Sequence, residues 1–262
     1  MAEFWRSTAL PDLEARRSCQ ENSCYRPHAH DSFSIGAIDS GTSVLTGPLD
    51  GRMRLEPGDV IIIPAGQVHA CNPDQGRWLY QMIHMDQAWV TSLAPGGEAS
   101  RLFDGIRVLR HPELHSMVSA INDMIFTDEP REPLEAQFAV LFTELEAAAP
   151  AHLATSYADP ELLTRLASVM YRLRTDQSNP ALTELAESIG MSKFQLIRAM
   201  RRVTGLSPLA WRQNARVVMA RRLLREGRSI AETAHALGFT DQSHFHRVFR
   251  AHVAASPGSY RG

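Results

Sequence analysis

Three histidines in the first part of the chain could do chemistry together. His28 and His30 are two residues apart, and His69 follows further along. Neutral imidazole nitrogens bind zinc or iron, and they also form hydrogen bonds with polar groups of organic ligands. The residue types therefore allow two kinds of site: a metal centre, or a pocket for an organic molecule with imidazoles at its rim.

Arginine and glutamine residues near the starts of two predicted helices could read DNA. In the major groove, arginine pairs with guanine and glutamine with adenine. We predict base contacts for Arg198 and Arg247, although an arginine there could instead bind a phosphate. Phe194 or Ile197 could touch a thymine methyl group, although such residues more often pack in a core. The complete predicted DNA-binding set is Lys193, Phe194, Gln195, Ile197, Arg198, Arg201, Gln242, Ser243, His246, Arg247 and Arg250.

Helices must position these side chains, because the C-terminal part of the chain shows helical periodicity throughout. Asp159 and Pro160 are typical of a helix start. Ser192, Ser229 and either Thr240 or Asp241 can cap later helices, and glycines mark the ends. The predicted helices cover about 160–173, 182–189, 192–203, 208–226, 229–238 and 241 onward.

An internal repeat runs through these helices. Ala186-x3-Gly190-x-Ser192 matches Ala234-x3-Gly238-x-Thr240, and Leu196-x-Arg198-x-Met200 matches Phe245-x-Arg247-x-Phe249. The offset is 48 residues before the turn and 49 after it. Each repeat is a short helix, a turn with glycine and a longer basic helix, which is the plan of a helix-turn-helix motif. The repeat therefore predicts two such motifs.

The N-terminal part predicts short strands with Gly and Pro between them, which favours a β-barrel or jelly roll. Strands are expected at 32–38, after the turn at 55–58, and at 77–85, with helices from about 100 to 149 and residues 1–24 preceding the barrel. Trp78, Tyr80, Met82 and His84 share one face of the last strand. His84 by itself indicates only an ordinary position. The predicted ligand-binding residues are His28, His30, Phe33, His69, Trp78 and Tyr80.

The charge divides between the two parts. Residues 1–150 carry 11 Arg against 21 Asp and Glu, a net −10, whereas residues 151–262 carry 16 Lys and Arg against 8 acids, a net +8. This asymmetry indicates a second domain that faces a polyanion. No apolar run approaches the ~18–20 residues of a membrane span, and no leader is expected. The odd number of cysteines, Cys19, Cys24 and Cys71, favours a reducing cytoplasm.

The stretch from Leu182 to Tyr260 resembles the AraC/XylS family of bacterial transcription regulators. The match is carried by LTELAESIGMSKFQLIRAMRRVTGLSP and SIAETAHALGFTDQSHFHRVFRAHVAASPGSYR. The resemblance implies two helix-turn-helix subdomains joined by a long helix over about 208–226, with their recognition helices in successive major-groove segments. Ala254 departs from the pattern, because the family usually has Gly there.

Two further segments resemble the cupin motifs: Pro27-His28-x-His30-x5-Gly36 and Gly58-x5-Pro64-x-Gly66-x2-His69-x2-Asn72. Metal-binding cupins add a Glu three or four residues after the second histidine, where this chain has Phe33 and Ser34. The resemblance implies an α+β chain: a cupin-like β-barrel (jelly roll) followed by helices, then an all-α domain. In the AraC family such a barrel senses a small molecule, and the helices after it often form the dimer.

The sequence therefore predicts a cytoplasmic, nucleoid-associated transcription regulator and not an enzyme. Residues 1–152 are the expected ligand-sensing and dimerisation domain, and residues 159–262 the DNA-binding domain. Its expected partners are promoter DNA, a small-molecule effector, a second copy of the chain and, for an activator, RNA polymerase; no cofactor and no membrane are expected. Two alternatives are a metal-dependent cupin enzyme using His28, His30 and His69, and a regulator whose barrel only dimerises.

Overall fold

The structure is a computed structural model that describes residues 2–11, 13–21, 25–47, 52–155, 159–176 and 179–262. The chain forms two compact units: Met1–Cys24 with Ala29–Thr155, and Tyr25–His28 with Ser156–Gly262. Cys24 and part of the predicted linker, residues 156–158, lie outside the described residues. No helix in the described part of the chain is long and apolar enough to cross a membrane.

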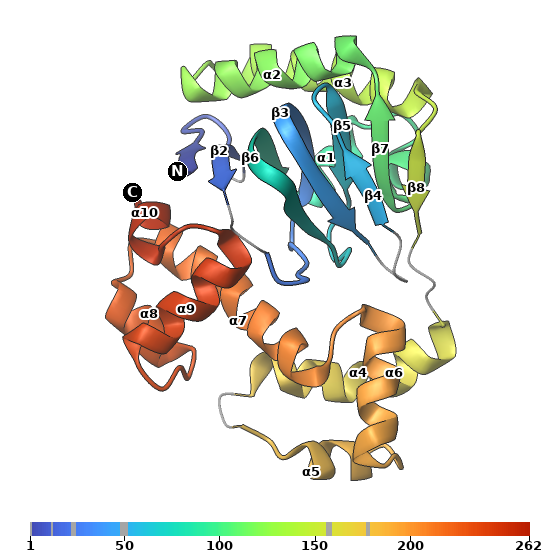
Figure 1. Cartoon of the computed structure of the whole chain (residues 1–262), viewed down its shortest axis with the longest axis vertical. Coiled ribbons are helices and arrows are strands. Elements are labelled where there is room, and N and C mark those ends of the chain that lie inside the picture. The colour runs from blue at the N-terminus through green and yellow to red at the C-terminus, as the bar shows by residue number, and fades with distance from the viewer. Residues whose placement is uncertain (1, 12, 22–24, 48–51, 156–158, 177–178) are drawn as a thin grey trace. The chain divides into compact units, whose positions relative to one another are not determined.

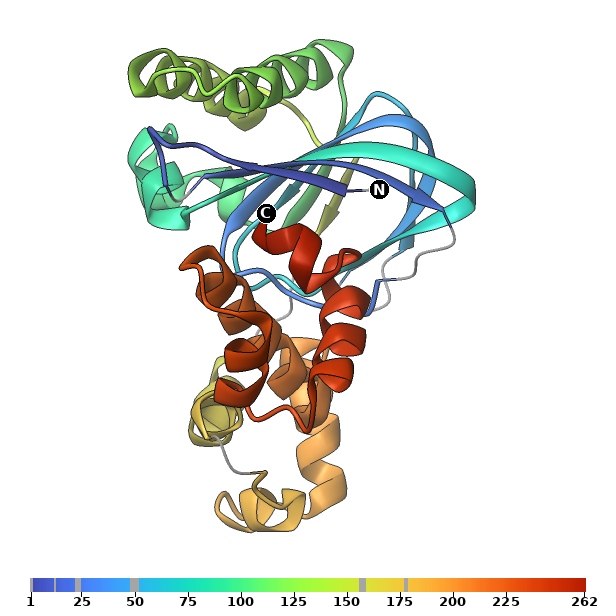
Figure 2. The same ribbon diagram turned by 90° about the vertical axis from the view of Figure 1, so that its left-hand side faces the viewer.

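The first unit is built on one antiparallel sheet (Figure 1). The strand order is β1-β2-β6-β3-β5-β7-β8, with β4 paired to β3. The strands are β1 (Ala2–Arg6), β2 (Glu14–Glu21), β3 (Phe33–Thr46), β4 (Arg52–Leu55), β5 (Asp59–Ile63), β6 (Ala70–Met85), β7 (Ile106–Arg110) and β8 (His152–Ala154). The two long strands, β3 and β6, pair along most of their length and curve strongly in Figure 2.

The predicted strands at 32–38, after the turn at 55–58, and at 77–85 are confirmed within β3, β5 and β6. Two expectations are wrong. Residues 1–24 do not simply precede the sheet, because β1 and β2 are part of it. The stretch after residue 100 is not wholly helical, because β7 pairs with β5.

Helices cover one face of this sheet. They are α1 (Gln87–Leu93), the short 3-10 turns η2 (Gly97–Ala99) and η3 (Arg101–Phe103), α2 (Pro112–Phe126) and α3 (Arg131–Ala147). Buried residues of α2 and α3, such as Ile121 and Phe138, form one core with Phe33 and Ile62 of the strands. The opposite face, here named the inner face, has its own core of Trp78, Tyr80 and aliphatic residues.

The second unit is helical. Its helices are α4 (Pro160–Thr175), α5 (Leu182–Glu187), α6 (Lys193–Thr204), α7 (Pro208–Arg225), α8 (Ile230–Ala236), α9 (Gln242–Val253) and α10 (Pro257–Arg261). The periodicity and caps in the sequence predicted the first six of these closely, because both signals are local. The segment Tyr25–His28 belongs to this unit, and the Arg26 N–H donates to the Ala251 carbonyl at 3.0 Å.

Ala254 ends α9 in the left-handed conformation, with φ 51°. An L-residue pays a steric cost there that glycine avoids, so Ala254→Gly should stabilise the second unit by about 1 kcal/mol. Urea unfolding followed by circular dichroism measures this. The matched control is Ala251→Gly inside α9, which should destabilise by about 1 kcal/mol. A loss of stability in Ala254→Gly would contradict the prediction.

Candidate nucleic-acid interface and inner-face site

The first candidate recognition helix, α6, begins with a capping box. The Gln195 N–H donates to Ser192 Oγ at 3.3 Å, and the Ser192 N–H donates to Gln195 Oε1 at 2.7 Å. Such reciprocal bonds satisfy the free N–H groups of the first turn. The Gln195 oxygen is therefore already used in this structure, and a contact from it to adenine would have to replace the capping bond.

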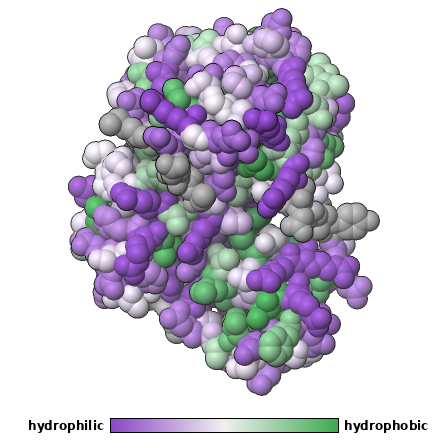
Figure 3. Space-filling model, in the orientation of Figure 1, coloured by the Kyte–Doolittle hydropathy of each residue, from purple (hydrophilic) through white to green (hydrophobic). Residues whose placement is uncertain are grey.

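The faces of α6 follow the predicted phase. Leu196 and Met200 are fully buried against α4 and α5. The exposed residues are Lys193, Phe194, Gln195, Arg198 and Arg201, and Ile197 is half-buried. Phe194 is 70% exposed, so it is not a core residue, and the Lys193 ammonium lies 5.4 Å from its ring centre. In Figure 3 apolar residues gather over the region where Figure 1 draws α4 and α6.

Arg198 lines a hollow of about 270 Å³ between α4 and α6. Arg165 and Arg202 line the same hollow, and Arg202 pairs with Asp159 at 3.2 Å. Three guanidinium groups against one carboxylate leave this side of α6 positively charged. The hollow therefore favours an anionic partner such as the phosphate backbone, beside any base that Arg198 reads.

The second candidate recognition helix, α9, is capped by Asp241, whose carboxylate accepts from the His244 N–H at 2.7 Å. Phe245, Val248 and Phe249 point inward as predicted. Phe249 packs edge-on against Phe245 and Tyr260, with both ring centres at 5.5 Å. Gln242, Ser243, Arg247 and Arg250 are exposed, and His246 is half-buried. Arg247 thus extends from the exposed side of α9, whose opposite side packs through these aromatic rings.

The long helix α7 joins the two repeats. Its 18 residues correspond to about 27 Å of helix. Trp211 Nε1 donates to the Met170 carbonyl of α4 at 3.3 Å, and Arg221 Nε donates to the Tyr260 hydroxyl of α10 at 3.2 Å. Each end of α7 is thus tied to one repeat.

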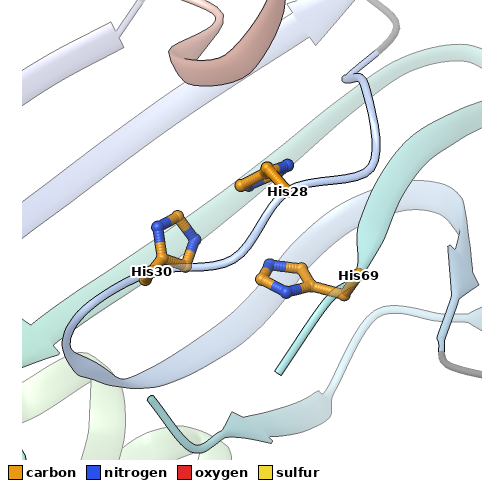
Figure 4. A group of neighbouring side chains, drawn as sticks. All are labelled: His28, His30 and His69. Carbon is orange, nitrogen blue, oxygen red and sulfur yellow. The ribbon is translucent and has the colours of Figure 1, made fainter. Parts of the chain in front are cut away.

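The predicted histidines lie outside the strands: His28 and His30 precede β3, and His69 directly precedes β6. Figure 4 shows His28, His30 and His69, and one ring nitrogen of each lies within 4.8 Å of the others. His69 Nδ1 is 3.0 Å from the Gln67 carbonyl and His28 Nδ1 is 2.7 Å from the Arg26 carbonyl. If each Nδ1–H donates to its carbonyl, each Nε2 carries the lone pair that can accept a hydrogen bond or bind a metal.

His84 joins this group, contrary to the expectation of an ordinary position. Its side chain is buried, and its ring centre lies 4.8 Å from that of His30. Ser34 occupies one of the two positions where metal-binding cupins have a carboxylate, and its hydroxyl forms a 2.8 Å hydrogen bond with His84 Nδ1. Among the described residues, the candidate metal ligands are three histidines, His28, His30 and His69. Zinc or iron could be held by such nitrogens, but the acidic ligand of the cupin pattern has no counterpart at Phe33 or Ser34.

The other predicted ligand-binding residues lie on opposite faces of the sheet. Trp78 and Tyr80 lie on the inner face, where their rings stack at 4.2 Å. Phe33 lies on the helix face, edge-on to Phe103 and Phe142. Side chains of adjacent strand residues point to opposite faces, so Phe33 cannot share a pocket with Trp78. We therefore leave Phe33 out of the proposed ligand site.

Sequence reasoning missed a polar row on β2. Glu14, Arg16, Ser18 and Gln20 are all at most 5% exposed. They share the inner face, because Ser18 pairs with Tyr80 and Gln20 with Trp78 in the register of β2 and β6. A strand whose buried side is polar lacks the alternation of apolar residues by which strands are found.

Burial of His69 leads to a prediction about acid stability. Loss of hydration lowers the pKa of this imidazole from 6.5 to about 4, partly opposed by the bond to Gln67. The folded state then binds fewer protons than the unfolded state between these values. The unfolding free energy of the first unit should therefore be highest above pH 6.5, and it should decrease as the pH drops from 6.5 towards 4. Urea unfolding at several pH values measures this dependence.

His69→Asn should flatten that dependence. Val140→Ala is the matched control in the same unit, because Val140 is 51% exposed and does not titrate. Equal pH profiles for wild type and His69→Asn would contradict the assignment.

A curved sheet covered by helices on one face, followed by two joined helix-turn-helix repeats, is the architecture of a DNA-binding regulator with a ligand-binding domain. The comparisons agree. The chain belongs to the AraC family of transcription regulators, because residues 10–193 match the model of the AraC-like ligand binding domain. Residues 185–262 match a helix-turn-helix domain model.

Similar proteins support this assignment. The HTH-type transcriptional regulator NimR of Escherichia coli K12 is 27% identical over 258 residues, which cover 90% of each chain. The arabinose operon regulatory protein of Salmonella typhimurium is 24% identical and covers 78% of this chain and 75% of its own. The crystal structure of ToxT from Vibrio cholerae O395 aligns with a TM-score of 0.58 at 14% identity, over 100% of this chain and 96% of ToxT. At this low identity, the similarity to ToxT shows that the two chains share a fold.

Proposed function

We propose that this AraC-family regulator reads promoter DNA with α6 and α9. The observation that carries the proposal is the structural repeat. Both helices begin at a side-chain cap, bury the same face and expose an arginine, Arg198 or Arg247, one turn after the start. Side chains in the first turns of a groove-inserted helix are the ones that reach base edges. The net charge of +8 on residues 151–262 supports contact with the backbone.

Genomic site mapping with the purified full chain tests this proposal, followed by binding measurements at several salt concentrations. The expected result is a small set of preferred sites with two separated half-elements. If about six phosphates are neutralised, affinity should fall by about 10³-fold between about 50 and 200 mM salt. Binding without sequence preference would contradict the assignment of base-reading roles.

A small-molecule effector on the inner face of the sheet would control this activity. Support comes from the buried side chains of His69, Trp78 and Tyr80 and the half-buried side chain of His30, which bring polar atoms and aromatic rings to one domain. One solved structure of Vibrio cholerae ToxT has an unsaturated fatty acid bound to it. An effector can change the activity only if its affinity differs between two arrangements of the protein. A homodimer through α2 and α3, action in the cytoplasm at the nucleoid, and contact with RNA polymerase complete the proposal.

A metal-dependent enzyme is the second candidate, and the histidine group is the observation in its favour. The relatives are transcription regulators, which argues against it. Elemental analysis of natively purified protein separates the two. A transition metal at one equivalent per chain would favour the second candidate, and its absence would remove it.

A further inference from the structure

The hollow between α4 and α6 is lined by three arginines that come from two different helices. Arg165 belongs to α4, whereas Arg198 and Arg202 belong to α6, where they are one turn apart. The remaining lining residues are uncharged. The volume of about 270 Å³ lies just below the roughly 300–1,000 Å³ of pockets that enclose organic ligands. The size and the charge therefore suit a small anionic group.

Arg165 is held in position by the turn between α5 and α6. Its Nε and Nη2 atoms donate to the Ile189 carbonyl at 3.3 and 2.9 Å, and Nη2 also donates to the Gly190 carbonyl at 3.3 Å. Within the part of the chain that the structure describes, neither Arg165 nor Arg198 forms an ion pair with a carboxylate. A guanidinium that is oriented but not neutralised attracts an anion. Arg165 therefore brings a fixed positive charge from α4 to the side of α6.

Arg202 differs from the other two arginines, because Asp159 neutralises it. Asp159 Oδ1 accepts from the Leu162 N–H at 3.0 Å and so caps α4, and Asp159 Oδ2 lies 3.2 Å from Arg202 Nη2. The Asp159 and Arg202 side chains are 30% and 69% exposed. An ion pair this exposed contributes little to stability, so another anion can displace the carboxylate at small cost. The cap fixes Asp159 to α4, whereas the long side chain of Arg202 can turn away from it.

We propose that the α4–α6 hollow holds one phosphate group of the DNA backbone, and that Asp159 competes with this phosphate for Arg202. Arg165 and Arg198 attract the phosphate, and Arg202 leaves Asp159 to join them when DNA binds. Because phosphate contacts do not depend on sequence, Asp159 lowers the affinity for preferred and random DNA alike. The inference rests on the proposed function, in which α6 lies in the major groove, and it extends the DNA interface to α4.

Asp159→Asn tests the competition in the full-length chain. Asparagine caps a helix as well as aspartate does, so the variant keeps the cap and loses only the charge. The affinity for DNA should rise by about 2- to 5-fold, because the carboxylate no longer holds Arg202. Fluorescence anisotropy with labelled preferred and random duplexes measures this change, and both duplexes should show it.

Glu161→Gln is the matched control for the loss of charge. Glu161 is an exposed acid in the first turn of the same helix, and the carboxylate that pairs with Arg202 is that of Asp159. The control should therefore raise the affinity less than Asp159→Asn does. An equal rise in the two variants would mean that Asp159 only repels DNA as any surface acid does, and the competition would be overturned.

Arg202→Gln tests the other partner of the ion pair. Arg202 is mostly exposed, so the variant should fold, and the affinity should fall by about 5- to 10-fold near about 0.1 M salt. The slope of log affinity against log salt should become shallower by about 0.9, because one phosphate contact is lost. Adding Asp159→Asn to this variant should have no further effect. A gain from Asp159→Asn that is the same with and without Arg202 would refute the inference.

Neutral methylphosphonates then locate the phosphate. Each phosphate of the preferred duplex is replaced in turn, which removes one negative charge at a known position. The wild type should lose affinity at a position to which Arg202→Gln is insensitive, and Arg165→Gln should be less sensitive than the wild type at the same position. If the wild type and Arg202→Gln lose affinity at the same positions and to the same extent, the hollow holds no phosphate.

The outcomes separate this inference from the proposed function. A preference of the wild type for its mapped sites over random DNA tests base reading by α6 and α9, and it does not depend on the hollow. If the preference is found but the Asp159 and Arg202 variants show no coupling, the phosphate site is overturned and the proposed function stands. If no preference is found, the proposed function fails, and the variants measured on random DNA still decide whether the hollow binds a phosphate.

Discussion

Arg247→Ala is expected to weaken binding at the preferred DNA site by about 1–3 kcal/mol, which is about 5- to 160-fold. Arg247 is exposed on α9, whose opposite side is fixed by Phe245 and Phe249. A bidentate arginine–guanine contact is lost in the variant, so discrimination at one base position should also relax. Titrations of wild type and variant against the preferred site and its single-base substitutions measure both effects.

Arg198→Ala should weaken binding in the same way at the other half of the site. A larger part of this loss should come from contacts with the DNA phosphate backbone, which do not depend on sequence. Its neighbours Arg165 and Arg202 line the same hollow, which suits an anion such as a DNA phosphate. Arg225→Ala, an exposed arginine at the end of α7, is the matched control. Equal weakening on preferred and random DNA would identify Arg247 or Arg198 as a phosphate contact.

Phe249→Ala is expected to destabilise the second repeat by about 3–5 kcal/mol. Phe249 is fully buried between Phe245 and Tyr260, and its removal leaves a cavity under α9. Because a domain is stable by only about 5–15 kcal/mol, this loss would strongly reduce the folded population near 37 °C. Urea unfolding measures the change, and DNA binding should weaken with it.

Leu209→Ala is the control for that experiment. Leu209 is 62% exposed at the start of α7, so its truncation should stay within about 0.5 kcal/mol. Met200→Ala tests the counterpart of Phe249 in the first repeat, since Met200 is also fully buried, and should cost about 2–5 kcal/mol. If Phe249→Ala unfolds at the urea concentration of the wild type, the second repeat does not depend on this aromatic core.

The helices of the second unit could largely be predicted from the sequence. Ser192 and Asp241 do cap their helices, and Leu196, Met200, Phe245 and Phe249 are buried as their spacing indicated. Caps and helical periodicity depend on residues within one or two turns of each other, so a single sequence contains them. Ala254 stands where the resembling family usually has Gly, and the structure shows the left-handed conformation that glycine adopts more easily.

The sheet was only partly readable. The aliphatic run Val60–Ile63 predicted β5, but the polar strand β2 gave no signal. Strand pairing joins residues far apart in the chain, and the sequence does not state the partner or the register. For the same reason it left open which face of the 77–85 strand points to the inner side of the sheet.

The sequence by itself determined the repeat, the caps, the charge division and the histidine motif, because each is a pattern of neighbouring residues. Only the tertiary structure decided that Phe33 faces the helices, that His84 joins His30, and that Arg16 lies on one face with Trp78. Those facts depend on the register between β2, β6 and β3, which the folded sheet fixes by burying one side of each strand.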